Sequence, residues 1–219
     1  MRTPENYEHK LFLARDIEDE PNTIGFEVAR KINKELENIP TYVGIRLYGS
    51  ILRGYANINE GSDIDIRVLY NIEEPVEEYE GIHPEDKLLR RAQELELELQ
   101  GETGTEVVLK PTLLSLQAIE RTIQSKDYKT AGEYIGQLTG LIQGKKAYEY
   151  RNKVREILST LPANVKEDIF EAIVERLIWE DGYRRDKWKN RTGFSDDEIN
   201  KILARRAELW KYRVTKLYQ

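Results

Sequence analysis

The stretch YGSILRGYANINEGSDID, residues 48–65, constrains the fold of this chain more than any other part of it. A short apolar run leads into the pair Gly49-Ser50, and a second run begins at Asp63. After Asp63 the apolar and polar residues alternate, which is the two-residue period of a β-strand. Asp63, Asp65 and Arg67 are therefore predicted on one face of that strand, and the isoleucines between them on the other.

The polar residues of this stretch suit the binding of a phosphorylated ligand and of metal ions. Glycine lets the backbone approach a phosphate, the N–H groups at the start of a following helix point at the anion, and Ser50 adds a hydroxyl. Carboxylates two residues apart on a strand can share two metal ions ~3.5–4 Å apart. We therefore predict a nucleoside triphosphate site with two Mg²⁺ ions, for which Mn²⁺ can substitute. The alternative is an ordinary turn before a surface strand with two solvated acids.

Hydrophobic periodicity and turn residues predict the other elements. Up to Pro111 they alternate: a helix over 24–36, a strand over 43–48, a short helix after Ser50, a strand over 63–70, a helix from Pro84 to about Gly101, and a strand over 105–111. Beyond this point the pattern predicts only helices, over 115–124, 128–143, 146–160, 164–189 and 195–217. Two of these helices begin with the spacing of a capping box, Asn164 with Glu167 and Ser195 with Glu198.

The order of these elements predicts an α+β fold. A small mixed β-sheet with flanking helices forms the core, and an all-helical domain, basic at its C-terminal end, follows. We place the division between residues 1–112 and residues 113–219.

Three short motifs in the first half resemble a known family. Gly49-Ser50, Gly54 four residues after the serine, and the run Ser62-Asp-Ile-Asp65 resemble the signature of the DNA polymerase β-like nucleotidyltransferase superfamily. The resemblance implies a small mixed sheet that carries both motifs at one end, a third carboxylate on the next strand, and a helical domain after the sheet. It covers roughly the first 110 residues.

The resemblance assigns roles to particular residues. Asp63 and Asp65 would bind the metal ions, and Glu106 would be the third ligand and the base that takes the proton of the acceptor hydroxyl. Glu102 is the fallback for this third position. Lys110 shares the predicted strand face of Glu106 and could instead neutralise it. The residues expected to contact the nucleotide are Gly49, Ser50, Arg53, Ser62 and Arg67, with a structural ion pair as the alternative role of Arg67.

The activity that these residues imply is a metal-dependent transfer of a nucleoside monophosphate from an NTP to a hydroxyl acceptor, with release of pyrophosphate. An RNA end is one such acceptor, because the run SDIDIRVLY has a slight resemblance to the branch associated with RNA repair and RNA ligases. Two alternatives stay open. One is an antitoxin-like module of the same fold that modifies proteins or is catalytically weak and regulatory, and the other is an aminoglycoside-type enzyme that modifies small molecules.

Charge is distributed unevenly along the chain, although the net charge is only −6. The segment from Tyr183 onward has 11 Lys and Arg against 5 Asp and Glu, which leaves 23 basic and 35 acidic residues before it. Basic residues interleaved with aromatic ones can hold phosphates and stack on bases, so RNA or another nucleic acid is an expected partner of this segment. A solvated helical surface is the alternative. A homo-oligomer is also among the expected assemblies of this chain.

Composition excludes several other classes of site. The chain has no cysteine, which rules out disulfides and thiolate metal sites. The first residues, MRTPENYEHK, form no apolar signal region, and the mean hydropathy is −0.66. We therefore expect a cytoplasmic protein with no membrane partner.

Glycines recur every fourth residue at positions 132, 136, 140 and 144. Glycine inside a helix costs ~0.5–1 kcal/mol against alanine, so a continuous helix over these positions needs a compensating close approach. The interpretations are close packing of another helix on this seam, or contact of the seam with the nucleotide.

Overall fold

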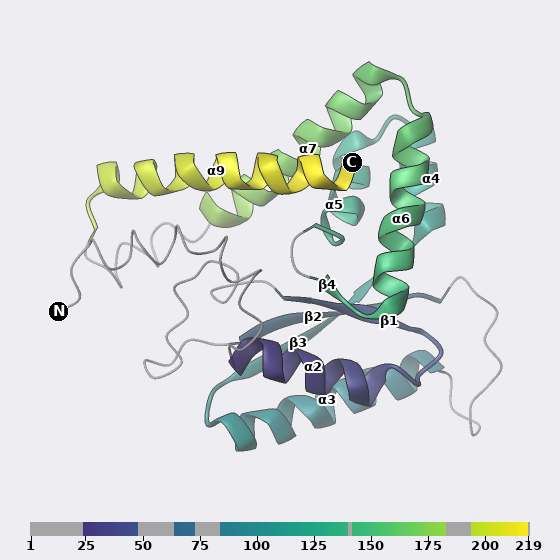
Figure 1. The fold of residues 1–219 in the computed structure, drawn as a ribbon, viewed down its shortest axis with the longest axis vertical. Coiled ribbons are helices and arrows are strands. Elements are labelled where there is room, and N and C mark those ends of the chain that lie inside the picture. Colours follow the sequence, from purple (N-terminus) through teal and green to yellow (C-terminus); the bar gives the residue numbers. More distant parts are fainter. Residues whose placement is uncertain (1–23, 48–63, 73–83, 140–141, 183–193, 219) are drawn as a thin grey trace. The chain divides into compact units, whose positions relative to one another are not determined.

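The computed structural model describes residues 24–47, 64–72, 84–139, 142–182 and 194–218 (Figure 1). The described strands form one four-stranded sheet in the order β3-β2-β1-β4. Strand β1 (Tyr42–Leu47) is antiparallel to both β2 (Ile64–Tyr70) and β4 (Ile142–Gln143), and β2 is parallel to β3 (Val107–Leu113). The sheet is therefore mixed, and helices flank it and follow it. The predicted α+β fold with a small mixed sheet is confirmed.

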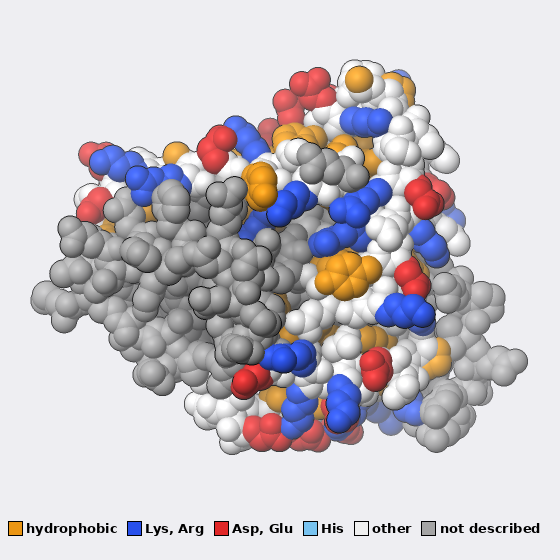
Figure 2. Space-filling view, in the orientation of Figure 1, with side chains coloured by type: hydrophobic (Ala, Val, Ile, Leu, Met, Phe, Trp, Pro, Cys, Tyr) orange, Lys and Arg blue, Asp and Glu red, His pale blue; other side chains and the backbone are white. Residues whose placement is uncertain are grey.

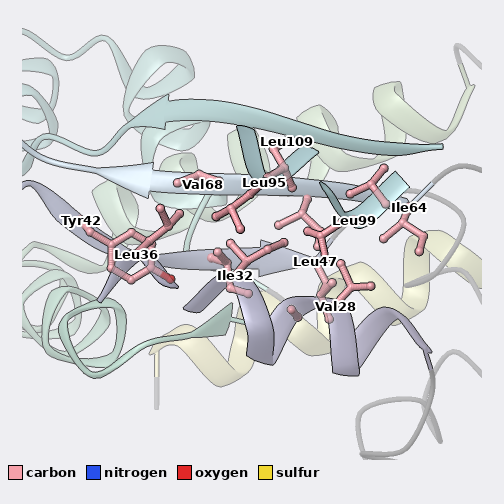
Figure 3. Close-up of a cluster of buried hydrophobic side chains, with 14 of the residues drawn as sticks. Val28, Ile32, Leu36, Tyr42, Leu47, Ile64, Val68, Leu95, Leu99 and Leu109 are labelled. Carbon is pink, nitrogen blue, oxygen red and sulfur yellow. The ribbon is translucent and has the colours of Figure 1, made fainter. Parts of the chain in front are cut away.

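Helices α2 (Ile24–Leu36) and α3 (Pro84–Thr103) cover one face of this sheet (Figure 1). Figure 3 shows their apolar side chains packed against those of the strands in one buried cluster. In α2 these residues recur every fourth position at Val28, Ile32 and Leu36, and Ile64 and Val68 meet them from β2. Each such buried aliphatic side chain contributes ~1.5–3 kcal/mol to the stability of the fold.

Strand β3 differs in its bounds from the strand predicted over 105–111. It begins at Val107 and continues through Pro111 to Leu113. Proline lacks a backbone N–H, but β3 lies at an edge of the described sheet, where a missing donor is tolerated. Pro111 therefore does not end the strand.

Strand β4 contradicts the expectation that no strand follows Pro111. Helix α5 (Tyr128–Gly136) ends seven residues before the predicted end at Gln143, and Ile142 and Gln143 pair with Arg46 and Ile45 of β1. Gly144 then has a φ of +111°, which glycine tolerates and other residues rarely adopt. A strand of two residues is too short to show an alternating pattern, so periodicity alone cannot predict it.

The other helices lie close to their predicted positions: α4 (Leu116–Gln124), α6 (Lys145–Thr160), α7 (Ala163–Gly182) and α9 (Asp196–Tyr218). At the start of α9 the predicted capping box is present, because the Glu198 carboxylate accepts hydrogen bonds from the N–H and hydroxyl of Ser195 at 2.8 and 2.7 Å. The capping box predicted at Asn164 is wrong, since α7 already begins at Ala163.

The described residues fall into two compact units. The sheet unit contains the described residues up to Ser115 together with residues 142–150, and the helical unit contains Leu116–Thr139 together with residues 151–182 and 194–218. The proposed boundary at residue 112 stays a prediction. Among the helices that the structure describes, none combines the length and the apolar character needed to cross a membrane.

In the helical unit, α5 packs against α7 at Gly132. A Cβ atom on Gly132 would lie 3.0 Å from Cβ of Ala172, which leaves no room for a larger side chain. The glycine spacing is therefore explained at this position by close helix packing. It does not mark one continuous helix, because Gly144 lies beyond β4 and Gly140 lies outside the described residues.

Candidate active site

Asp65 lies in β2, between two isoleucines that belong to the hydrophobic core. Because side chains alternate along a strand, the Asp65 carboxylate lies on the sheet face opposite α2 and α3. Only 2% of the residue is exposed. A carboxylate buried to this extent needs a compensating positive charge or several hydrogen bonds.

Three basic residues form a row across the sheet on the same face as Asp65. Arg46 of β1 pairs with Arg67 of β2, and Arg67 pairs with Lys110 of β3. Residues that pair directly across strands point to the same side, and Arg67 is two residues from Asp65, so all four side chains share one face. We call Arg46, Arg67 and Lys110 the cation row.

Arg46 is the member of the cation row that the sequence interpretation missed. It is 3% exposed, and its neighbours Ile45 and Leu47 lie in the core on the opposite face. The sequence could have predicted the position of Arg46. In a strand over 43–48 the side chains alternate, so residue 46 lies on the face opposite the core-facing positions. Arg67, which the sequence did single out, donates from Nη1 to Oγ1 of Thr112 at 3.3 Å.

Lys110 forms an ion pair with Asp65. Its Nζ lies 4.0 Å from Oδ1 of the aspartate, across the parallel pairing of β2 and β3. One interpretation of the sequence was that Lys110 neutralises Glu106, but the structure pairs it with Asp65. The contact with Asp65 arises because the register aligns Asp65 with Val108, so that Lys110 is one step further along on the same face. Asp65 therefore has a cationic neighbour on its own face of the sheet.

Glu106 lies directly before β3 and is exposed. Its carbonyl oxygen accepts a hydrogen bond from the Ile64 N–H at 2.8 Å, which extends the β2–β3 ladder to this residue. Because Asp65 pairs with Val108, Glu106 is two residues before the partner of Asp65, or about 6.6 Å along the strand. Glu106 and Asp65 are thus at the same end of two neighbouring parallel strands.

The fallback residue, Glu102, lies elsewhere. It is in α3, where its carboxylate accepts a hydrogen bond from Nζ of Lys31 in α2 at 2.5 Å. This ion pair joins two helices that cover the core face of the sheet, whereas Asp65 lies on the other face. The geometry therefore favours Glu106 over Glu102 as the acid that accompanies Asp65.

Five of the predicted site residues, Gly49, Ser50, Arg53, Ser62 and Asp63, lie outside the described residues. The structure places Asp65 and Glu106 at one end of β2 and β3, and it places Arg67 in the middle of β2 on the same face as Asp65. Within the described ranges, no group of three or more acidic or histidine side chains is arranged to hold a metal ion. A metal site with three carboxylates at this position would need Asp63 in addition to Asp65 and Glu106. Carboxylate oxygens are the ligands that Mg²⁺ prefers, so the chemistry of this donor set fits the ion.

The first part of the basic segment that we considered for nucleic-acid binding, residues 183–193, also lies outside the described residues. Of its aromatic residues, Trp210 is 4% exposed and therefore part of the core of the helical unit. On the face shown in Figure 2, the basic and acidic side chains of the described residues are interspersed. In α7 the Trp179 side chain is exposed, and the Arg176 guanidinium lies 4.7 Å from its ring centroid.

Comparison with known proteins adds one finding. Residues 29–130 match the family model described as "Nucleotidyltransferase domain". The matched segment runs from α2 into α5 and contains Gly49-Ser50, Asp63, Asp65 and Glu106. No curated protein and no solved structure is significantly similar to the chain.

Proposed function

We propose that this protein transfers a nucleoside monophosphate from an NTP to a hydroxyl acceptor in a metal-dependent reaction, because residues 29–130 match a nucleotidyltransferase domain, in agreement with the motif resemblance. Nucleotidyl transfer is the general activity of such domains. The metal requirement, the roles of the residues and the acceptor are the parts that we infer.

One observation carries the proposal. A buried aspartate, Asp65, and an exposed glutamate, Glu106, lie at the same end of two parallel strands, inside the matched segment. Asp63, two residues before Asp65, is the third acid of the proposed set. Together these carboxylates would hold divalent metal ions, which neutralise phosphate charge and activate the attacking hydroxyl when bound.

The chain's own residues would carry the other parts of the reaction. The acceptor oxygen attacks the α-phosphorus, forming a new P–O bond, while the bond from the α-phosphorus to the bridging oxygen breaks and pyrophosphate leaves. Glu106 takes the proton of the acceptor hydroxyl, a role suited to a carboxylate that is open to solvent. Gly49-Ser50 and Arg53 would hold the triphosphate before and during this step.

An RNA end is the acceptor that we place first. The basic residues after Tyr183 support it, as does the exposed Trp179 with the Arg176 guanidinium beside its ring, since exposed aromatic rings can stack on bases. A protein hydroxyl and a small molecule of the aminoglycoside type are the other acceptor classes, and the experiment below separates them.

The test uses the purified protein with each α-³²P-labelled NTP, Mg²⁺ or Mn²⁺, and either total RNA or an RNA-free cell extract. We expect label to enter RNA and pyrophosphate to be released in proportion. Label in protein or in a small molecule would move the acceptor to one of the other classes. If no acceptor is labelled with any NTP, the proposed activity is wrong.

A pair of variants tests the role of Glu106. Glu106→Gln removes the proposed base and metal ligand, and should reduce the transfer rate by at least about 100-fold. Glu102→Gln changes an acid of similar exposure in the same unit and should keep the wild-type rate. The reverse result would make Glu102 the third carboxylate.

A further inference from the structure

We propose that Lys110 is the resident counter-ion of Asp65 in the nucleotide-free protein, and that its ammonium must leave this carboxylate before a divalent metal ion binds there. The inference rests on the proposed function in one respect, since it takes Asp65 as a metal ligand.

The Lys110 ammonium balances part of the charge of the Asp65 carboxylate. The aspartate side chain is 3% exposed, and the Lys110 ammonium lies 4.0 Å from its Oδ1. A positive charge at this distance compensates part of the cost of burying a carboxylate. The same charge repels a divalent cation that approaches the same oxygen, so metal binding and the ion pair compete.

Lys110 is the most exposed member of the cation row. Arg46 is almost fully buried, and Arg67 is partly buried and bonded to Thr112. Lys110 lies on the edge strand β3, and 54% of its side chain is exposed. Its flexible four-carbon stem can therefore turn the ammonium into solvent at small cost, whereas the two guanidinium groups have less room to move.

A consequence follows for the order of binding. In the nucleotide-free protein the metal ion must displace Lys110 without the help of a nucleotide. This cost weakens the affinity of the Asp65 site for the metal ion. An NTP–metal complex brings phosphate oxygens that can accept the released ammonium, so the charge of Lys110 remains compensated. Lys110 would thus be a positioning residue that favours entry of the metal together with the nucleotide.

The test is a titration of the full-length, nucleotide-free protein with Mn²⁺, in which free Mn²⁺ is measured by electron paramagnetic resonance. Lys110→Met removes the charge and should bind Mn²⁺ roughly fivefold more tightly than the wild type, the size expected for loss of one half-exposed ion pair. Lys110→Arg keeps the charge and should bind like the wild type. Lys31→Met breaks an ion pair with Glu102 in the same unit and serves as the matched control, with no expected change.

Each other result overturns the inference. Unchanged Mn²⁺ affinity in Lys110→Met means that the ammonium does not compete with the metal. Weaker affinity together with a lower free energy of unfolding means that the pair is structural. A gain in Lys110→Arg as large as in Lys110→Met excludes charge as the cause.

Asp65→Asn separates this inference from the proposed function. If it abolishes Mn²⁺ binding while Lys110→Met has no effect, the metal site stands and only the inference fails. If Asp65→Asn binds Mn²⁺ like the wild type, Asp65 is not a metal ligand, and both fail.

Discussion

Tyr42, at the start of β1, is hydrogen-bonded to a side chain of α2. Its hydroxyl donates a hydrogen bond to Oδ1 of Asn33 at 2.9 Å, and the residue is 3% exposed. Burial, with a smaller effect of the nearby Glu37 charge, raises the pKa of Tyr42 well above the usual value for tyrosine. Ionisation of this side chain is therefore coupled to unfolding.

The first prediction concerns the alkaline pH dependence of stability. Because the pKa of Tyr42 is higher in the folded than in the unfolded chain, its contribution to stability is full below about pH 10 and is lost as the pH rises above that value. Tyr42→Phe removes this titration, so its free energy of unfolding should fall less steeply than that of the wild type between pH 10 and 11.5. At pH 7 the variant should be less stable by about 1 kcal/mol, because the hydrogen bond to Asn33 is lost.

Urea unfolding at pH 7, 10 and 11 measures both effects. Parallel curves for the two proteins above pH 10 would show that Tyr42 does not resist ionisation in the folded state.

At this scale the sequence predicted which face a side chain occupies, but not which side chain it contacts. The alternation in residues 63–70 was enough to put Asp65 and Arg67 opposite the core. The ion pair between Asp65 and Lys110 depends on the register of β2 against β3, which are parallel and joined through α3. No local pattern encodes that register, so the contact required the structure.

At the scale of elements, the junction of β1 with β4 and α6 depends on two glycines. A Cβ atom on Gly44 would lie 2.4 Å from the carbonyl oxygen of Gln143 and 2.6 Å from Cβ of Ala147. A Cβ atom on Gly144 would lie 2.8 Å from Cα of Gly44. The two segments approach so closely that neither position accepts a side chain without movement of the backbone.

The second prediction is that Gly44→Ala destabilises the protein by about 1–3 kcal/mol, the usual range for an overpacked site. Gly101→Ala is the matched control. Gly101 is in α3 and a Cβ atom there would contact nothing within 4 Å, so this variant should gain about 0.5–1 kcal/mol from the higher helix propensity of alanine. Denaturant midpoints of the two variants should therefore shift in opposite directions. A neutral Gly44→Ala would mean that β4 does not pack on β1 as described.

The elements also show where pattern reading failed. The sequence predicts a helix over 128–143, and the apolar residues Ile135, Leu138 and Ile142 do continue a helical spacing past Gly136. In the structure Ile135 and Leu138 are buried in the helical unit and Ile142 in the sheet unit, so the periodicity is coincidental across the boundary. Tertiary pairing with β1, rather than local propensity, determines the conformation of residues 142 and 143.

At the scale of the whole molecule, the sheet unit is discontinuous in sequence. Residues 142–150 return to it after the segment Leu116–Thr139 has joined the helical unit. They bring Ile142, Ala147 and Tyr150, all of which are buried. The family match at residues 29–130 stops short of this returning segment.

The third prediction is that the sheet unit needs the returning segment to fold. A chain that ends after Tyr150 should retain the tertiary structure of the sheet unit, whereas one that ends after Thr139 should not. The shorter chain lacks β4, one of the two strand partners of β1, and three buried side chains, each worth up to a few kcal/mol, in a domain whose net stability is of the order of 5–15 kcal/mol. Near-ultraviolet circular dichroism and urea unfolding compare the two. Equal cooperative unfolding of both chains would contradict the assignment of residues 142–150 to this unit.

The central claim is that Asp65 belongs to the catalytic site of a nucleotidyltransferase, and pyrophosphate release by Asp65→Asn tests it most directly. Removing this proposed metal ligand should lower the rate of release from NTP and acceptor by at least about 100-fold, with folding intact by circular dichroism. Asp197→Asn, which changes an exposed acid at the start of α9, should release pyrophosphate at the wild-type rate. A folded Asp65→Asn protein with wild-type activity would contradict the account.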